Sequence, residues 1–188
     1  MRPILFSMLL WLAMGCQSAP STDASVAEER EATPASLGLT DIGEAGEQGA
    51  RLVRDYEGFA PVLSPTDDQV YVVNFWATWC KPCVEELPYF EQLHETYSEQ
   101  GVTFVFVSLD FPRQIEKKYY PFLKERQLPG YHIALLDTRS STWVDRVHPD
   151  WSGAIPATLY IQGDRTAFHE GSYANYEQLE AALQDFLR

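Results

Sequence analysis

The sequence predicts an α/β fold in which a central mixed sheet is flanked by helices. The first observation is an apolar and β-branched run over residues 70–73, continued by Phe75 and Trp76, which is typical of a strand buried on both faces. The second is a helical pattern of apolar residues that follows it directly, over residues 81–98. The third is that strand-like and helix-like segments go on alternating towards the C-terminus, as in a sheet covered by helices.

Residues 1–15 have the pattern of a signal peptide. Arg2 gives a short positive region, and residues 4–14 are apolar except for Ser7. This run is too short to cross a bilayer, which needs about 20 apolar residues. We therefore expect residues 1–15 to be removed and not to belong to the fold.

Cys16 follows the predicted signal peptide directly. Residues 12–16, Leu-Ala-Met-Gly-Cys, resemble a bacterial lipobox, with alanine where leucine is commonest. Ordinary cleavage after Gly15 of a secreted protein is the alternative, but Cys16 is the one cysteine outside the pair at 80 and 83. Lipidation of Cys16 is therefore predicted, and Gln17 resembles the sorting residue of lipoproteins that leave the inner membrane.

The next segments carry little that can be buried. Residues 17–36 are rich in Ala, Ser, Thr, Pro and Glu, which predicts a disordered tether with an r.m.s. span on the order of 25 Å. Residues 37–50 are rich in glycine and give no clear pattern. We place the start of the domain at residue 37, so that it spans residues 37–188. A short edge strand is predicted at 51–56, and a short helix at 57–63.

The chain then alternates between predicted helices and strands. Pro88 predicts a kink in helix 81–98, and Gly101 is expected to end that helix. Pro121 predicts a bend in the next helix. The predicted elements are a strand at 102–109, a helix at 112–127, a strand at 133–136 and a short helix at 140–147.

The C-terminal part predicts a hairpin and a final helix. Pro156 opens an apolar strand that ends near Ile161, and residues 162–165 read as a hairpin turn into a strand at 166–170. Asn175 with Gln178 three residues later is typical of a capping box, and it opens a terminal helix with an apolar face.

Cys80 and Cys83 form the candidate reactive site. Two thiols three residues apart on a first helical turn can close a short disulfide, and Pro82 stiffens the loop between them. The free N–H groups and positive end of the helix favour a thiolate, so Cys80 is the expected nucleophile and Cys83 the resolving thiol. A zinc half-site and a structural disulfide are the alternatives. Zinc would need a second pair of ligands, and the mature chain offers only four scattered histidines.

Residues 74–83, Asn-Phe-Trp-Ala-Thr-Trp-Cys-Lys-Pro-Cys, resemble the thioredoxin-fold active site. With Glu86-Leu87-Pro88 behind them, they are most similar to the TlpA/ResA-like extracytoplasmic thiol-disulfide oxidoreductases. The resemblance covers about residues 50–188, and it implies a thioredoxin fold with a central strand-helix insertion at about 110–147. It also implies a cis-proline loop, facing the disulfide, at Ile155-Pro156. Substrate contacts are expected at Trp79, Lys81, Pro82, Ile155 and Pro156.

Glu86 matches the glutamate that follows the motif in that family. A carboxylate near two thiols can shuttle a proton or raise the pKa of the buried thiol, so Glu86 is a candidate catalytic residue. The alternative is that its negative charge only interacts favourably with the positive, N-terminal end of the helix dipole. Asn74 stands where thioredoxins carry a buried aspartate, and its amide cannot titrate, so proton handling falls to Glu86 or water. Trp76 is expected in the core, and the four histidines are expected to be structural or solvated.

The expected function is reduction of protein disulfides by a membrane-tethered, extracytoplasmic enzyme. An oxidase or isomerase, or a non-catalytic binding module, are the alternatives, and a peroxidase is disfavoured because no Thr-x-x-Cys arrangement is present. No metal or organic cofactor is expected. Expected partners are thiol or disulfide proteins, apocytochrome c being one possibility, and a membrane or periplasmic electron donor. The net charge of −13, with no Lys/Arg cluster standing out, argues against nucleic acid, and a monomer is expected.

Overall fold

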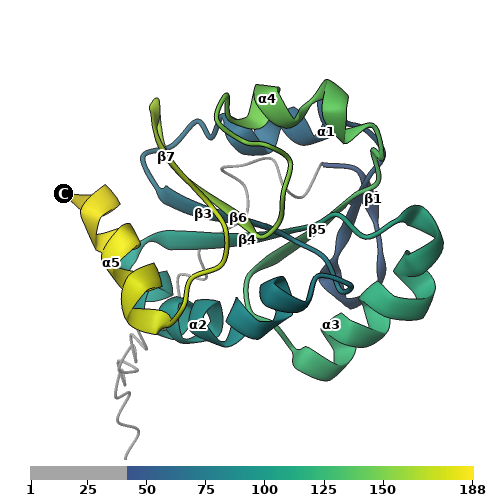
Figure 1. Ribbon diagram of the computed structural model, residues 1–188, viewed down its shortest axis with the longest axis horizontal. Helices are drawn as coiled ribbons and strands as arrows, with labels where there is room; N and C mark the ends of the chain where they lie inside the picture. The colour runs from purple at the N-terminus through teal and green to yellow at the C-terminus, as the bar shows by residue number, and fades with distance from the viewer. Residues whose placement is uncertain (1–41) are drawn as a thin grey trace, which may run out of the picture. The chain divides into compact units, whose positions relative to one another are not determined.

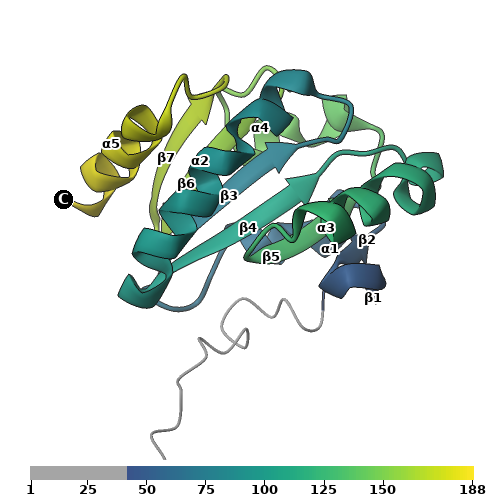
Figure 2. The ribbon, with the colours of Figure 1, turned by 90° about the horizontal axis from the view of Figure 1, so that it is seen from below.

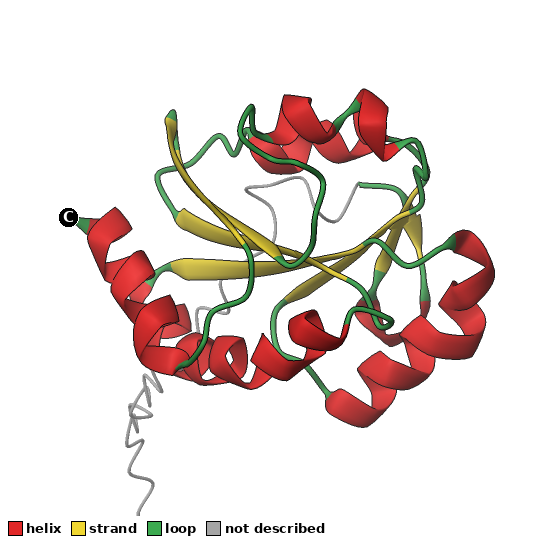
Figure 3. Cartoon of the chain, viewed as in Figure 1, coloured by secondary structure: helices red, strands yellow, loops and turns green. Residues whose placement is uncertain are grey.

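The computed structural model describes residues 42–188, which form a seven-stranded mixed sheet with helices on both faces (Figures 1 and 3). The strand order is β1-β2-β5-β4-β3-β6-β7. The strands are β1 (Glu44–Ala45), β2 (Arg51–Val53), β3 (Val70–Trp76), β4 (Val102–Ser108), β5 (Tyr131–Leu135), β6 (Ala157–Gln162) and β7 (Arg165–Glu170).

Strand β3 lies in the middle of the sheet. It pairs in parallel with β4 and antiparallel with β6, and all seven of its residues are buried. This explains the apolar run, because a strand covered on both faces has no solvent side on which polar residues would be placed. The predicted strand at 70–76 is therefore confirmed.

The helices divide between the two faces of the sheet (Figures 1 and 2). α2, α3 and α5 cover one face, where they bury Leu87, Leu123 and Leu183 in one core. α1 and α4 cover the other, beside a second core that contains Phe59 and Trp143. The helical segments are η2 (Glu47–Gly49), α1 (Tyr56–Phe59), η3 (Ala60–Leu63), α2 (Lys81–Tyr97), η4 (Ser98–Gln100), η5 (Pro112–Gln114), η6 (Ile115–Tyr119), α3 (Tyr120–Arg126), η7 (Ser140–Thr142), α4 (Val144–Val147) and α5 (Tyr176–Leu187).

Helix α2 follows the sequence prediction closely. It contains Pro88 without a break in the helix and ends at Tyr97. The 3-10 turn η4 follows directly, and Gly101 ends that turn with a φ of 84°, in the left-handed region. At the far end of the chain, Asn175 caps α5, its side chain accepting a hydrogen bond from the Gln178 backbone N–H. The Gln178 side-chain oxygen accepts a hydrogen bond from the Ala174 backbone N–H. In a capping box it would accept this bond from the N–H of the N-cap residue, Asn175, one position later.

Two predictions about the elements were wrong. The segment at 51–56 is not an edge strand, because β2 lies between β1 and β5 and the short β1 forms the edge. The helix at 112–127 is not continuous, since it consists of η5 (Pro112–Gln114), a π-helical turn η6 (Ile115–Tyr119) and α3. Pro121 explains the break, since it has no N–H, and the Tyr120 N–H reaches back instead to the Ile115 carbonyl.

The predicted signal peptide, Cys16 and the tether lie outside the described residues. Within residues 42–188, none of the helices combines the length and the apolar character that crossing a bilayer requires.

Candidate active site

The two cysteines lie where β3 ends and α2 begins. Cys80 is the N-cap of α2, and the Cys83 backbone N–H points at its sulfur, 3.4 Å away. The two sulfurs form a disulfide. Cys80 keeps 6% of its surface exposed and Cys83 keeps none, so a partner molecule reaches Cys80 first. The N–H contact is the interaction that stabilises a thiolate at this position when the disulfide is open.

The loop before β6 faces this disulfide. The Ile155–Pro156 peptide bond is cis, and the Ile155 carbonyl oxygen lies 3.7 Å from the Cys80 sulfur. The predicted substrate-contact residues Ile155 and Pro156 are therefore brought next to Cys80. Lys81 and Pro82 are exposed on the first turn of α2, where Lys81 pairs with Glu85 at 3.2 Å.

Glu86 is buried one turn beyond Cys83. One carboxylate oxygen accepts a hydrogen bond from the Asn74 amide at 3.2 Å, and the other accepts one from the Tyr173 backbone N–H at 2.9 Å. Burial raises the pKa of Glu86 to about 7, although both hydrogen bonds act in the opposite direction. Glu86 therefore exchanges a proton near neutral pH, which an exposed helix-end glutamate would not do.

Asn74 links Glu86 to the neighbouring strand. Its amide nitrogen also lies 3.4 Å from the Thr158 hydroxyl of β6, while its own side-chain oxygen is buried without a hydrogen-bond partner among residues 42–188. The amide thus holds the carboxylate of Glu86 from the β3 side.

Asp110 is a site residue that the sequence analysis missed. It is buried two residues after the end of β4, and its carboxylate accepts hydrogen bonds from the Thr78 N–H at 3.0 Å and the Thr78 hydroxyl at 2.6 Å. The Ser108 hydroxyl donates a third bond at 2.8 Å. Asp110 therefore fixes the segment that leads from β3 to Cys80. Its signal in the sequence was its position at the carboxyl end of a strand that neighbours β3 in parallel.

Trp79 and Phe111 form an exposed aromatic pair beside the disulfide. Their rings stack with centroids 6.0 Å apart, and the side chains are 50% and 43% exposed. A cavity of about 180 Å³ lies behind them, lined also by Trp143 and Ile155. Trp76, by contrast, is fully buried in the core, as predicted.

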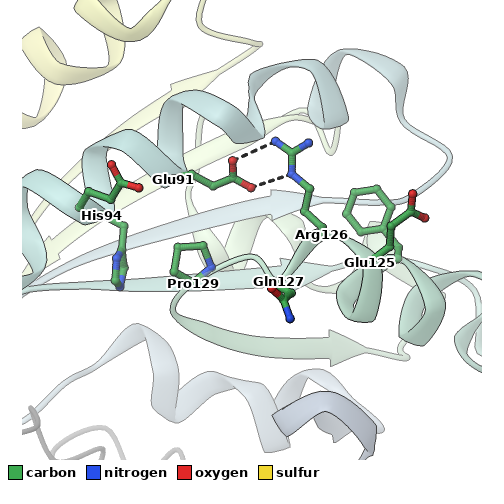
Figure 4. A pocket seen from close by; sticks show the side chains of 8 residues that line it. Glu91, His94, Glu125, Arg126, Gln127 and Pro129 are labelled. Atoms are coloured by element: carbon green, nitrogen blue, oxygen red, sulfur yellow. Dashed lines mark hydrogen bonds and ion pairs between the residues drawn. The ribbon is translucent and has the colours of Figure 1, made fainter.

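A wider hollow of about 730 Å³ lies between α2 and α3 (Figure 4). The Arg126 guanidinium binds Glu91 across it with two bonds, of 2.6 and 3.0 Å. Neither Cys80 nor Cys83 lines this hollow, so it is not the site of thiol-disulfide exchange. Within residues 42–188, no group of three or more His, Cys, Asp or Glu side chains is placed to hold a metal ion.

A sequence model of the AhpC/TSA family matches residues 54–165. This chain belongs to the AhpC/TSA family. Among curated relatives, the thiol-disulfide oxidoreductase ResA of Geobacillus kaustophilus is 32% identical over 97 residues, 46% of this chain and 56% of that protein. ResA of Oceanobacillus iheyensis is 42% identical over 72 residues, 38% of this chain and 32% of that protein. The chain thus spans about half, or less, of the length of these relatives.

A solved structure supports the fold assignment for this AhpC/TSA member. A thiol:disulfide interchange protein of the thioredoxin family from Chlorobium tepidum superimposes with a TM-score of 0.51 at 22% identity. The match covers 65% of this chain and 82% of that one. The chain has the thioredoxin fold that the sequence predicted.

Proposed function

We propose that this protein is a thiol-disulfide oxidoreductase that reduces disulfides in protein substrates through Cys80 and Cys83. The observation that carries the proposal is the position of Cys80 at the N-cap of α2, in contact with the Cys83 N–H and next to the Ile155 carbonyl. The name of the ResA relatives supports the same reaction type.

The reaction transfers two electrons from the protein dithiol to the substrate. The Cys80 thiolate attacks one sulfur of the substrate disulfide, so that bond breaks, a mixed disulfide forms and the other substrate sulfur leaves as a thiolate. Cys83 loses its proton and attacks the Cys80 sulfur, which releases the second substrate thiolate. The products are the Cys80–Cys83 disulfide and a substrate dithiol, protonated from the site and from water.

Glu86 is the proposed proton acceptor for Cys83. The buried carboxylate has a pKa of about 7, so it takes up and releases a proton without a large free-energy cost at neutral pH. Cys83 is fully buried and needs such an acceptor, because bulk water does not reach it. Asn74 and Tyr173 hold the carboxylate in place but cannot accept a proton themselves.

The substrate chain is proposed to bind across Trp79, Lys81, Pro82, Ile155 and Pro156. Trp79, Lys81 and Pro82 adjoin Cys80 in the chain, and the Ile155 carbonyl lies 3.7 Å from its sulfur. Cys80 is the more exposed of the two cysteines, and the cavity behind Trp79 offers space for an apolar side chain. The predicted signal peptide and the predicted lipidation of Cys16 support an extracytoplasmic location for the protein. Residues 17–36 would then be the tether between the membrane and the domain. A membrane or periplasmic electron donor would then restore the dithiol, and apocytochrome c is one candidate substrate.

Insulin reduction tests this proposal. The reduced protein should cleave the interchain disulfides of insulin and precipitate its B chain, while Cys80→Ser should give no rate above background. Thr166→Ser, at an exposed position of β7 that does not line the cavity behind Trp79, serves as a control for handling of the variants. A reduction potential above that of protein-disulfide isomerases, about −180 mV, would instead identify an oxidase.

A further inference from the structure

The basic side chains of this acidic protein are unevenly placed. The chain has a net charge of −13, and its lysines all lie between positions 81 and 124. Most cations of residues 42–188 are bound to carboxylates or backbone carbonyls. Those that form neither an ion pair nor a hydrogen bond within that part of the chain are Arg113, Lys117, Lys118 and Lys124.

The first three of these cations lie near the aromatic pair and the residues that precede Cys80. Lys117 and Lys118 line a groove of about 330 Å³ together with Thr78 and Trp79, the two residues that precede Cys80. The Arg113 guanidinium lies 5.7 Å from the Phe111 ring, which stacks on Trp79. Thr78 and Trp79 precede α2, and Lys117 and Lys118 precede α3. These two helices lie on the same face of the sheet (Figure 2).

The same surface carries exposed aromatic rings. Among residues 42–188, the large hydrophobic side chains that are exposed are Trp79, Phe111 and Leu187, and the first two form the stacked pair. Exposed aromatic residues with unpaired cations are typical of protein-binding surfaces. The exposed carboxylates of Glu116 and Glu125 lie on the same stretch, so residues 113–125 carry four unpaired cations against two anions, on a chain that is otherwise strongly negative.

We propose that this surface binds protein substrates through an acidic segment adjacent to their disulfide, with Arg113, Lys117 and Lys118 as the complementary cations. The inference rests on the proposed function and adds the substrate class to it. A protein as acidic as this one repels anionic partners at long range, so local cations beside the nucleophile determine which of them can approach. An anionic membrane is the less favoured occupant, because a bilayer lying flat on Trp79 would also cover Cys80 and exclude a substrate.

The test uses the full-length reduced protein and three synthetic peptides that share one intramolecular disulfide. Three Glu, three Ser or three Lys residues flank the disulfide in otherwise identical peptides. We expect the Glu peptide to be reduced roughly tenfold faster than the Lys peptide at low ionic strength, and the difference to shrink in about 0.5 M salt. Lys117→Glu should slow the Glu peptide roughly threefold to fivefold and leave the Ser peptide within twofold.

Lys124→Glu is the matched control, because it makes the same charge change on an exposed residue of α3 that does not line the groove. It should alter the Glu peptide rate less than twofold. Equal rates for all three peptides would overturn the inference while leaving the reductase function intact, whereas no reduction of any peptide would refute the function itself. If Lys117→Glu changes only the binding to vesicles that contain phosphatidylserine, the surface binds lipid and the inference is wrong.

Discussion

The carboxylate of Glu86 accepts a hydrogen bond of 2.9 Å from the backbone N–H of Tyr173, 87 positions further along the chain. Asn74 of β3 donates to the other oxygen of the same carboxylate. The active-site helix, the central strand and the segment before α5 therefore meet at one buried group. Because that group has a pKa of about 7, a carboxyl whose charge changes within the physiological pH range lies one helical turn beyond Cys83.

The first prediction concerns the chemistry of Glu86. Glu86→Gln should keep the fold but slow thiol exchange roughly tenfold to a hundredfold, because an amide cannot take the proton of Cys83. The native rate should change with an apparent pKa near 7, and the variant should lack that step. Stopped-flow reduction of a model disulfide between pH 5 and 9 measures both. Identical pH profiles would show that Glu86 only suits the helix dipole.

The second prediction concerns stability and follows from the same pKa. The pKa of Glu86 rises on folding from about 4.5 to about 7, so the folded state binds a proton that the unfolded state has already lost. The free energy of unfolding should therefore fall as the pH rises through this window, by up to roughly 3 kcal/mol. Glu86→Gln should flatten this dependence in urea unfolding measured from pH 4 to 8. If the free energy of unfolding of the variant changed with pH as much as that of the native protein, the raised pKa of Glu86 would be contradicted.

The third prediction concerns Asp110. An asparagine there has one acceptor oxygen for three donors, so Asp110→Asn should leave a Thr78 or Ser108 donor unsatisfied. We expect a loss of about 1–3 kcal/mol in the free energy of unfolding and slower alkylation of Cys80 in the reduced protein. Asp145→Asn on the surface is the matched control and should change neither quantity. An unaltered alkylation rate in Asp110→Asn would limit Asp110 to a structural role.

The fourth prediction concerns Cys16. A free thiol there would be open to oxidation in the same compartment as the active site, and acylation removes that hazard. Each buried CH₂ of an acyl chain adds about 0.8 kcal/mol of membrane affinity, so two or more chains anchor the protein firmly. Cys16→Ala should convert a protein that needs detergent into a soluble or uncleaved one with an unaltered domain. A native N-terminus without acyl mass would refute lipidation and leave the redox function untouched.

Local patterns in the sequence predicted much of the fold. Residues 70–76 predict a buried strand because Asn74 is the one polar residue among them. In the structure all seven residues are buried. The Asn175 cap and the hairpin turn at Gly163 are equally local, since each depends on a few neighbouring residues. The resemblance added the position of the loop at Pro156, which no local pattern shows.

Features that depend on distant contacts could not be predicted. The position of Asp110 after a predicted strand marks it as a candidate, but no local pattern pairs it with Thr78 or pairs Tyr173 with Glu86. Those contacts arise only when the sheet and α5 are assembled. The strand at 44–45 was missed since two residues give no periodicity. The cations at 113–118 lie in one short stretch of the sequence, but only the fold places Lys117 and Lys118 beside Trp79.

The most direct test of the account is to trap the mixed disulfide. Cys83→Ser, reduced and then mixed with a disulfide peptide, should accumulate a covalent adduct that mass spectrometry locates on Cys80, because no second thiol releases it. Cys80→Ser should form the adduct at a much lower rate, since Cys83 has no exposed surface. An adduct that forms on Cys83 as fast as on Cys80, or no adduct on either, would contradict the assignment of Cys80 as the nucleophile.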